Sequence, residues 1–144
     1  MAETLQFELV SPERLVLSQA AEMVVVPGSE GDFGAMPRHA PLISAVRPGV
    51  IDVYQGGAIT SRIFVAGGFA EVTAERCTVL AEEALPVADL DAGKVTARID
   101  AAQKSLTEAT DDFARGNAQR ELAIGQAMRT AMELKPAAAA AAAH

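Results

Sequence analysis

Tryptophan is absent from this sequence, tyrosine occurs once, and cysteine occurs once, as Cys77. Without aromatic rings to line a large cavity, the core must be filled by Val, Ile and Leu, which suits closely packed sheet faces. A single cysteine excludes an internal disulfide and a metal site with several cysteine ligands. We therefore expect a protein of a reducing compartment, with the cytosol as the default.

Basic residues are also scarce, with 12 Lys and Arg against 19 Asp and Glu and a formal net charge of −7. Nucleic-acid binding draws its affinity from cations that neutralise phosphates, so this balance argues against a nucleic-acid partner. No segment reaches the ~18 consecutive apolar residues of a membrane-spanning helix, and the N-terminus does not resemble a targeting signal. A neutral or basic protein partner is the simpler expectation.

The first part of the chain has the pattern of a β protein. Short apolar runs alternate with turn signals, which predicts eight or more short strands in a sandwich or barrel. Leu5, Phe7 and Leu9 alternate with polar residues as in a half-buried strand, whereas residues 23–26 form a continuous apolar run typical of a fully buried strand. Residues 55–57, Gln-Gly-Gly, indicate a hairpin turn.

At Pro86 the pattern changes to a helical period, which places a boundary between about Glu83 and Asp89. We divide the chain into a β part at residues 1–86, a helical hairpin at residues 87–135 and a low-complexity, Ala-rich tail at residues 136–144.

Two apolar stripes in the second part predict two helices with one narrow apolar face each. The first stripe is Val95, Ile99, Ala102, Leu106, Ala109 and Phe113, and the second is Ala118, Leu122, Gly125, Met128 and Met132. Asp89 or Asp91 can cap the first helix. The connection lies either at residues 110–112, as the Asp pair favours, or at residues 116–117, as the stripe favours.

The apolar faces of this hairpin are rich in Ala and Gly. Each methyl group contributes at most about 0.8 kcal/mol on burial, whereas ordering one backbone residue costs about 1 to 2 kcal/mol. Isolated helices of this length are marginal in water. We therefore predict that the hairpin can leave its own β domain, and that amides in residues 90–134 exchange faster than those of the strands.

Several residues with reactive side chains have spacings that favour ordinary structural roles. The glycine-rich residues 28–34 match no phosphate-binding pattern and predict a surface turn. His39 lacks further ligands for a metal, and Cys77 in its apolar run predicts a small buried side chain. The pairs Glu82-Glu83 and Asp111-Asp112 predict solvated surface. No nucleophile, base and orienting group can be assembled, so a small hydrolase is a weak alternative and we predict no catalytic or metal site.

Residues 24–51, VVVPGSEGDFGAMPRHAPLISAVRPGVI, resemble the signature region of the ε subunit of bacterial F-type rotary ATP synthases. The Gly-Ser-Glu-Gly loop, the Pro-x-His-Ala-Pro-Leu segment and the Pro-Gly turn follow in the family's order, and residues 66–72 are similar to its Gly-Gly-x-x-Glu-Val. The resemblance implies an α+β fold in two parts. An N-terminal antiparallel β-sandwich of about ten strands is followed by a C-terminal antiparallel α-helical hairpin.

The resemblance also implies a non-catalytic rotor subunit of the central stalk, peripheral on the cytoplasmic face of the bacterial inner membrane. In this family the sandwich binds the γ subunit, and the glycine-rich loop meets the c-ring with acidic side chains that have no fixed partner. Carried over by motif position, the residues facing the c-ring are Glu30, Gly31 and Asp32, and those at the γ or ring contact are Ser11, His39 and Ser44.

In some relatives the first helix binds ATP through a consecutive sequence motif. The motif has Ile or Leu at its first position, followed by Asp, two variable residues, Arg and Ala. Here Leu90, Asp91 and Lys94 occupy matching positions, and Lys and Val95 replace Arg and Ala, which removes the planar fork that grips phosphate. This argues against ATP as a cofactor. In some relatives the hairpin also extends to the catalytic α and β subunits and restrains ATP hydrolysis. The same substitutions make that role a less direct expectation here than the coupling of c-ring rotation to γ. The alternative is a free-standing module that senses a nucleotide.

Overall fold

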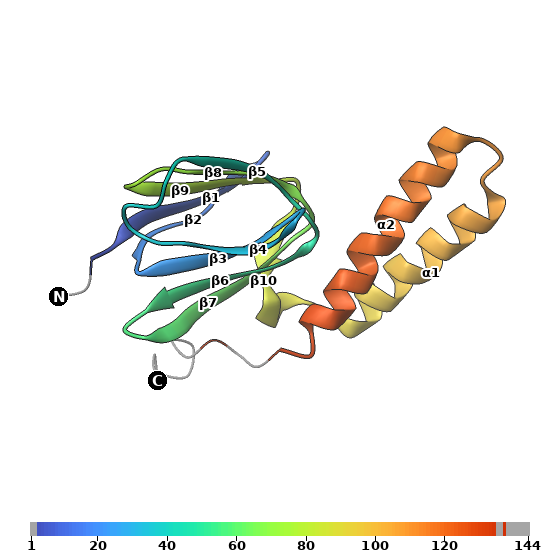
Figure 1. Cartoon of the computed structure of the whole chain (residues 1–144). Helices are drawn as coiled ribbons and strands as arrows, with labels where there is room; N and C mark the ends of the chain where they lie inside the picture. The colour runs from blue at the N-terminus through green and yellow to red at the C-terminus, as the bar shows by residue number, and fades with distance from the viewer. Residues whose placement is uncertain (1–2, 135–136, 138–144) are drawn as a thin grey trace.

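The computed structural model describes residues 3–134 and residue 137. Ten strands are followed by a short 3-10 helix, η1, and by two α-helices (Figure 1). In chain order the elements are β1 (Leu5–Ser11), β2 (Arg14–Ala21), β3 (Met23–Gly28), β4 (Gly31–Ala35), β5 (Leu42–Val46), β6 (Gly49–Gln55), β7 (Ala58–Val65), β8 (Gly68–Val72), β9 (Arg76–Ala81), β10 (Ala84–Pro86), η1 (Val87–Asp89), α1 (Ala92–Glu108) and α2 (Asp112–Ala131). The predicted tail, residues 136–144, lies outside the described residues except for Ala137.

The strands form a two-layered sandwich, which confirms the predicted fold class. One ladder runs in the order β10-β7-β6-β3-β5-β8-β9-β1-β2, with β4 added to β3, and it folds over at the single β3–β5 pair Gly28↔Val46. The layer of β5, β8, β9, β1 and β2 thus faces the layer of β10, β7, β6, β3 and β4 (Figure 1). The sheet is not wholly antiparallel, because β1 and β9 pair in parallel.

Aliphatic side chains fill the space between the layers, as the composition predicted. Leu5, Phe7 and Leu9 of β1 are buried, while their polar neighbours are half-buried. Cys77 is fully buried in the same cluster, which confirms its assignment as a small core side chain, and burial raises the pKa of its thiol to about 12. The prediction of a fully buried strand at residues 23–26 is wrong, because Val25 and Met23 are only half-buried on the outer face of β3.

The turns depend on glycine where the chain reverses most tightly. The hairpin predicted at residues 55–57 joins β6 to β7, with Gly56 and Gly57 at φ 61° and 76°. The glycine-rich residues 28–34 are not one surface turn. Only Ser29 and Glu30 form the turn, and the chain returns directly as β4, paired with β3 from Gly31 onward.

The two helices are joined at residues 109–111, the earlier of the two sites that the sequence left open. Asp91 caps α1 by accepting a hydrogen bond from the Lys94 amide at 2.8 Å, and Asp111 caps α2 by accepting one from the Ala114 amide at 2.7 Å. Because the chain turns here, Phe113 does not continue the first stripe. It is 81% exposed at the tip of the hairpin, so its assignment to an apolar helix face is wrong.

The hairpin packs with its open end against the outer face of β7 and projects away from the sandwich (Figure 1). Successive residues of β7 point to opposite sides, so Ile63 and Val65 join the core between the layers while Phe64 is buried under the helices. The residues that complete this second cluster are Ala66, Val95, Ile99, Ile124, Met128 and Ala131.

Candidate partner-binding surfaces

The β3–β4 turn carries the acidic residues predicted to face the c-ring. Gly31 adopts φ 131°, and a Cβ on Gly28 would lie 2.7 Å from the Gly31 carbonyl oxygen, so both glycines allow the tight reversal. Glu30 is exposed at the tip, and among the described residues it forms no hydrogen bond or ion pair.

Asp32 lies one step further into β4 and does have a fixed partner. Its Oδ1 accepts from Arg47 Nη2 at 2.5 Å, and Arg47 Nη1 also donates to the Gly28 carbonyl at 2.5 Å. Arg47 therefore ties β4 to the start of the turn. The prediction that both acids are unpaired is wrong for Asp32, and within the described part of this turn Glu30 alone presents a carboxylate without a protein partner.

The three residues predicted at the γ or ring contact are not gathered on one surface. Ser11 lies at the end of β1, level with Ala81, at the hairpin end of the sandwich, where the β3–β4 turn also lies. His39 lies in the β4–β5 loop at the opposite end, because the preceding Arg38 amide donates to the carbonyl of Ala74 in the β8–β9 turn at 2.7 Å.

Ser44 lies on the inward side of β5. Its register partner is the buried Ala70, and its neighbours on the same face, Leu42 and Val46, pack on the core. Its hydroxyl donates to the Ala45 carbonyl at 2.9 Å. The residues beside it, Ile43 and Ala45, point outward instead, so they and not Ser44 are placed for a partner.

An apolar row on the outer face of the β5-β8-β9-β1-β2 layer was missed in the prediction from sequence. It follows the strand register, with each member opposite the next: Ala45, Phe69, Leu80, Val10 and Leu15. Phe69 is 61% exposed, and Leu80 and Leu15 are each 56% exposed. Ile43, next along β5, is 73% exposed. We refer to these six residues as the apolar face.

The sequence does contain a sign of the apolar face, because residues 79–81 and 42–43 are apolar at consecutive positions. Consecutive strand residues point to opposite sides of the sheet, so such runs place apolar side chains on both sides. Charged groups border the face. Glu71 is exposed and lies opposite Ile43 in the register, and Arg76 of β9 pairs with Glu8 of β1 at 2.6 Å. A hydrophobic centre with a charged border is the usual anatomy of a protein-binding surface.

The positions compared with an ATP motif have structural roles. The Asp91 carboxylate caps α1, and Val95 is buried against the sandwich. A cavity of about 470 Å³ between β2, β7 and the end of α2 is lined by Leu90 but not by Asp91 or Lys94. The described residues contain no group of three or more His, Cys, Asp or Glu able to hold a metal ion.

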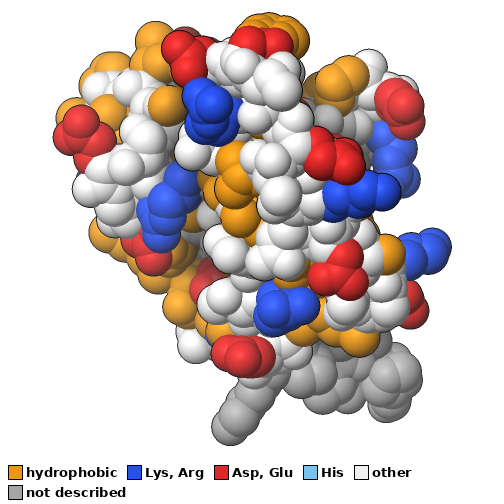
Figure 2. All heavy atoms as spheres, turned by 90° about the vertical axis from the view of Figure 1, so that its right-hand side faces the viewer, with side chains coloured by type: hydrophobic (Ala, Val, Ile, Leu, Met, Phe, Trp, Pro, Cys, Tyr) orange, Lys and Arg blue, Asp and Glu red, His pale blue; other side chains and the backbone are white. Residues whose placement is uncertain are grey.

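The face of the molecule that carries the hairpin shows acidic and basic side chains intermixed, without a field of one sign (Figure 2). This face therefore does not present the basic patch that a polyanion such as nucleic acid binds. None of the helices in residues 3–134 is both long and apolar enough to cross a membrane.

A two-layered sandwich with an apolar outer face, an acidic turn and an appended helical hairpin defines a β-sandwich protein with surfaces suited to binding other proteins. Residues 4–87 match the family model of the ATP synthase delta/epsilon chain, beta-sandwich domain. The chain belongs to this family, which confirms the resemblance found in its sequence. The family is that of a subunit of ATP synthase, in agreement with the prediction that the chain is not itself an enzyme.

Close relatives span nearly the whole chain. The ATP synthase epsilon chain of Rhodospirillum rubrum is 60% identical over 131 residues, covering 91% of this chain and 98% of that one. The epsilon chain of Paramagnetospirillum magneticum is 54% identical over 132 residues, covering 92% and 99%.

Among solved structures, a chain of the Euglena gracilis mitochondrial ATP synthase, in an assembly of OSCP, F1 and c-ring, matches with a TM-score of 0.78 and 20% identity. The match covers 90% of this chain and 82% of that one. A chain of the central stalk and c-ring of the Tetrahymena thermophila enzyme matches with a TM-score of 0.63, 11% identity and coverage of 91% and 98%. These two likenesses show a shared fold.

Proposed function

We propose that this chain is a rotor subunit of a proton-translocating bacterial ATP synthase, which links the γ subunit to the c-ring. It is bound peripherally at the cytoplasmic face of the inner membrane. The observation that carries the proposal is the apolar face, because six apolar side chains aligned across five strands need a protein partner to remove them from water. The relatives at 60% and 54% identity are named as epsilon chains, which supports γ as that partner.

The c-ring contact is assigned to the β3–β4 turn. Glu30 is exposed at its tip and has no ion-pair partner among the described residues, and the pairing of Arg47 with Asp32 holds the turn in one shape. A fixed turn with one free carboxylate can select a basic group on a ring loop and so set orientation more than affinity. His39, at the far end of the sandwich, is not part of this contact.

The proposal is tested by co-purification of the chain with γ and by titration of the pair. Phe69→Ser should weaken γ binding by about 2 kcal/mol or more, since buried aromatic anchors dominate interface energies. Phe113→Ser is the matched control, because it makes the same change at an exposed site on the hairpin tip. Equal affinity of the parent chain and Phe69→Ser would reject the apolar face as the γ-binding surface.

Restraint of ATP hydrolysis by the hairpin is a separate part of the proposal, and it requires the hairpin to leave its docked position. The limited apolar contact at its open end supports this, since the tip of the hairpin projects away from the sandwich. The alternative, a free-standing nucleotide sensor, gains no support from Asp91, whose carboxylate is occupied as a helix cap.

A further inference from the structure

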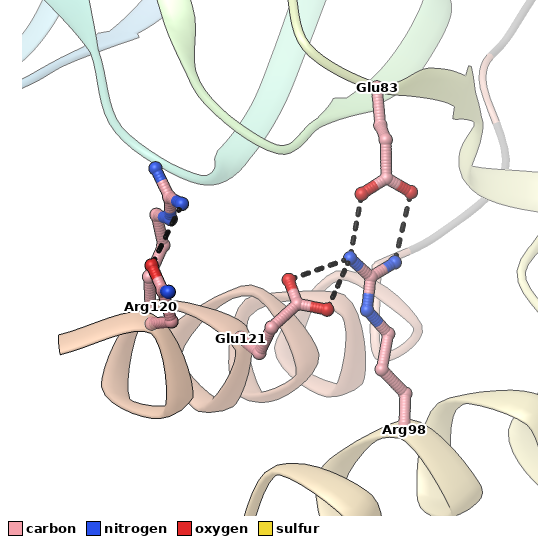
Figure 3. Close-up of polar contacts among 5 residues, drawn as sticks. Glu83, Arg98, Arg120 and Glu121 are labelled. Carbon is pink, nitrogen blue, oxygen red and sulfur yellow. Dashed lines mark hydrogen bonds and ion pairs between the residues drawn. The ribbon is translucent and has the colours of Figure 1, made fainter. Parts of the chain in front are cut away.

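The attachment of the hairpin has two components of different chemistry. The apolar component is the cluster around Phe64, which reaches only the first turns of α1 and the last turns of α2. The other is a cluster of three charged residues from three separate elements, which we refer to as the ion cluster. Its members are Glu83, Arg98 and Glu121 (Figure 3).

Arg98 is the centre of the ion cluster. It lies on α1 and forms a bidentate salt bridge with Glu83 in the β9–β10 turn. Arg98 Nη1 donates to Glu83 Oε1 at 2.9 Å, and Arg98 Nη2 donates to Glu83 Oε2 at 2.6 Å. Its Nη2 also donates to Glu121 of α2 at 3.1 and 3.3 Å. One guanidinium therefore joins both helices to the sandwich.

The arrangement has the features of a specific pair rather than an incidental surface contact. The Arg98 side chain is 25% exposed, and paired N–H donors on a planar fork fix orientation as well as distance. Hydrogen bonding from Arg98 lowers the pKa of Glu83 even though burial acts in the opposite direction. Glu83 lies on the exposed surface, as predicted, but its carboxylate is also paired with Arg98, which the sequence did not indicate.

The two components constrain the hairpin differently. Apolar contacts are non-directional, so the cluster around Phe64 favours burial at the open end of the hairpin without selecting one tilt. The ion cluster is directional. Both of its acidic members are nearly half exposed, at 45% and 49%, so mobile ions can screen it.

We propose that Glu83, Arg98 and Glu121 form a salt-sensitive latch that holds the hairpin in its docked orientation, and that its release frees the hairpin before either part unfolds. The latch is a property of this chain alone and does not depend on the proposed binding of γ. The Glu83–Arg98 pair joins hairpin and sandwich, whereas the Arg98–Glu121 pair holds the two helices in register around the same guanidinium.

The test is a distance measurement between spin labels on the full chain. Cysteines replace the exposed Glu75, in the β8–β9 turn at the far end of the sandwich, and the exposed Lys104, on α1. Cys77 stays in place because it is fully buried and does not compete for the label. The parent chain should show one narrow distance distribution at low salt and a second, broader population at about 1 M salt, where the Debye length is about 3 Å.

Arg98→Gln and Glu83→Gln should each show the broad population already at low salt, and added salt should change them little. Amide exchange in α1 and α2 should accelerate about fivefold, which corresponds to about 1 kcal/mol for a partly exposed ion pair. Exchange in the strands should stay at the parent rate. Arg115→Gln is the control, because it removes a 2.7 Å pair with Asp112 that lies within α2.

Three results would overturn the proposal. One is a single narrow distribution in both Arg98→Gln and Glu83→Gln. Another is an equal broadening in Arg115→Gln. The third is an acceleration of exchange in strands and helices alike, which would mean that the variants unfold globally instead of releasing the hairpin. Arg98→Lys, which keeps the charge but loses the planar fork, should fall between the parent and Arg98→Gln.

Discussion

Asp32 and Glu30 show how neighbouring acids of one turn can differ in role. Asp32 is paired with Arg47 at 2.5 Å, so its charge contributes to the shape of the turn, whereas Glu30 has no such partner among the described residues. Both carry the same formal charge and lie two positions apart. Only the position of Arg47, fifteen residues further along the chain, distinguishes them.

This difference leads to a prediction about the two side chains. Glu30→Lys should change stability by less than about 0.5 kcal/mol, as is usual for surface substitutions, but should reduce proton pumping by the assembled complex. Asp32→Lys faces Arg47 with a like charge, so it should lower the free energy of unfolding by up to about 1 kcal/mol as well. Urea unfolding of the free chain and proton uptake by membrane vesicles separate the two effects. Unchanged pumping in Glu30→Lys would contradict the ring contact.

Between the two long helices, one glycine lies directly against the facing helix. A Cβ on Gly125 would lie 2.7 Å from Ile99 Cγ1, closer than nonbonded carbon atoms normally approach, so the absence of a side chain here allows Ile99 to pack directly on α2. A Cβ on Gly116, in the exposed part of α2, would meet no atom within 4 Å other than those of its chain neighbours and its own helix backbone. The two glycines therefore serve different purposes.

Alanine substitution should affect these two glycines in opposite directions. Gly116→Ala should stabilise the hairpin by up to about 1 kcal/mol, because alanine orders more easily in a helix. Gly125→Ala gains the same propensity but overpacks against Ile99, at a typical cost of about 1 to 3 kcal/mol, so we expect a net loss of about 1 kcal/mol. Amide exchange in α2 measures both. Equal stabilisation by the two variants would show that the helices can separate at no cost.

For the molecule as a whole, the sandwich and the hairpin differ in how much apolar surface holds them. The sandwich has a continuous aliphatic core between two layers, while the hairpin shares one smaller cluster with the outside of β7. The regions of a protein with fewer buried contacts open at lower free energy. The predicted order of opening is therefore hairpin before sandwich.

Hydrogen exchange on the free chain tests this order. Amides in residues 90–134 should exchange faster than those of β1, β8 and β9, and addition of ATP at millimolar concentration should leave the hairpin rates unchanged. Equal protection of both parts would contradict a detachable hairpin. Saturable protection of the hairpin by ATP would favour the nucleotide-sensing alternative, even though Asp91 is occupied as a cap.

Local elements of this protein could be predicted from its sequence alone, because they depend on periodicity and on residues close in the chain. The alternation in β1, the Gly56-Gly57 turn and the change to a helical pattern at Pro86 all follow from such local rules. The motif in residues 24–51 was enough to identify the family. The helix connection stayed open, because the apolar stripe and the Asp111 cap pointed to different residues.

Which groups meet in space depends instead on how the chain folds over itself. The apolar face is exposed because the sheet folds over so that the opposite side of β5, β8 and β9 faces the core. Glu83 reaches Arg98 because the hairpin docks beside the β9–β10 turn. The alternation of side chains along a strand assigns them to two sides of the sheet. When both sides carry apolar residues, the sequence does not show which side is exposed to solvent. A salt bridge requires its charged groups to lie within about 4 Å, and separation along the chain does not predict such distances.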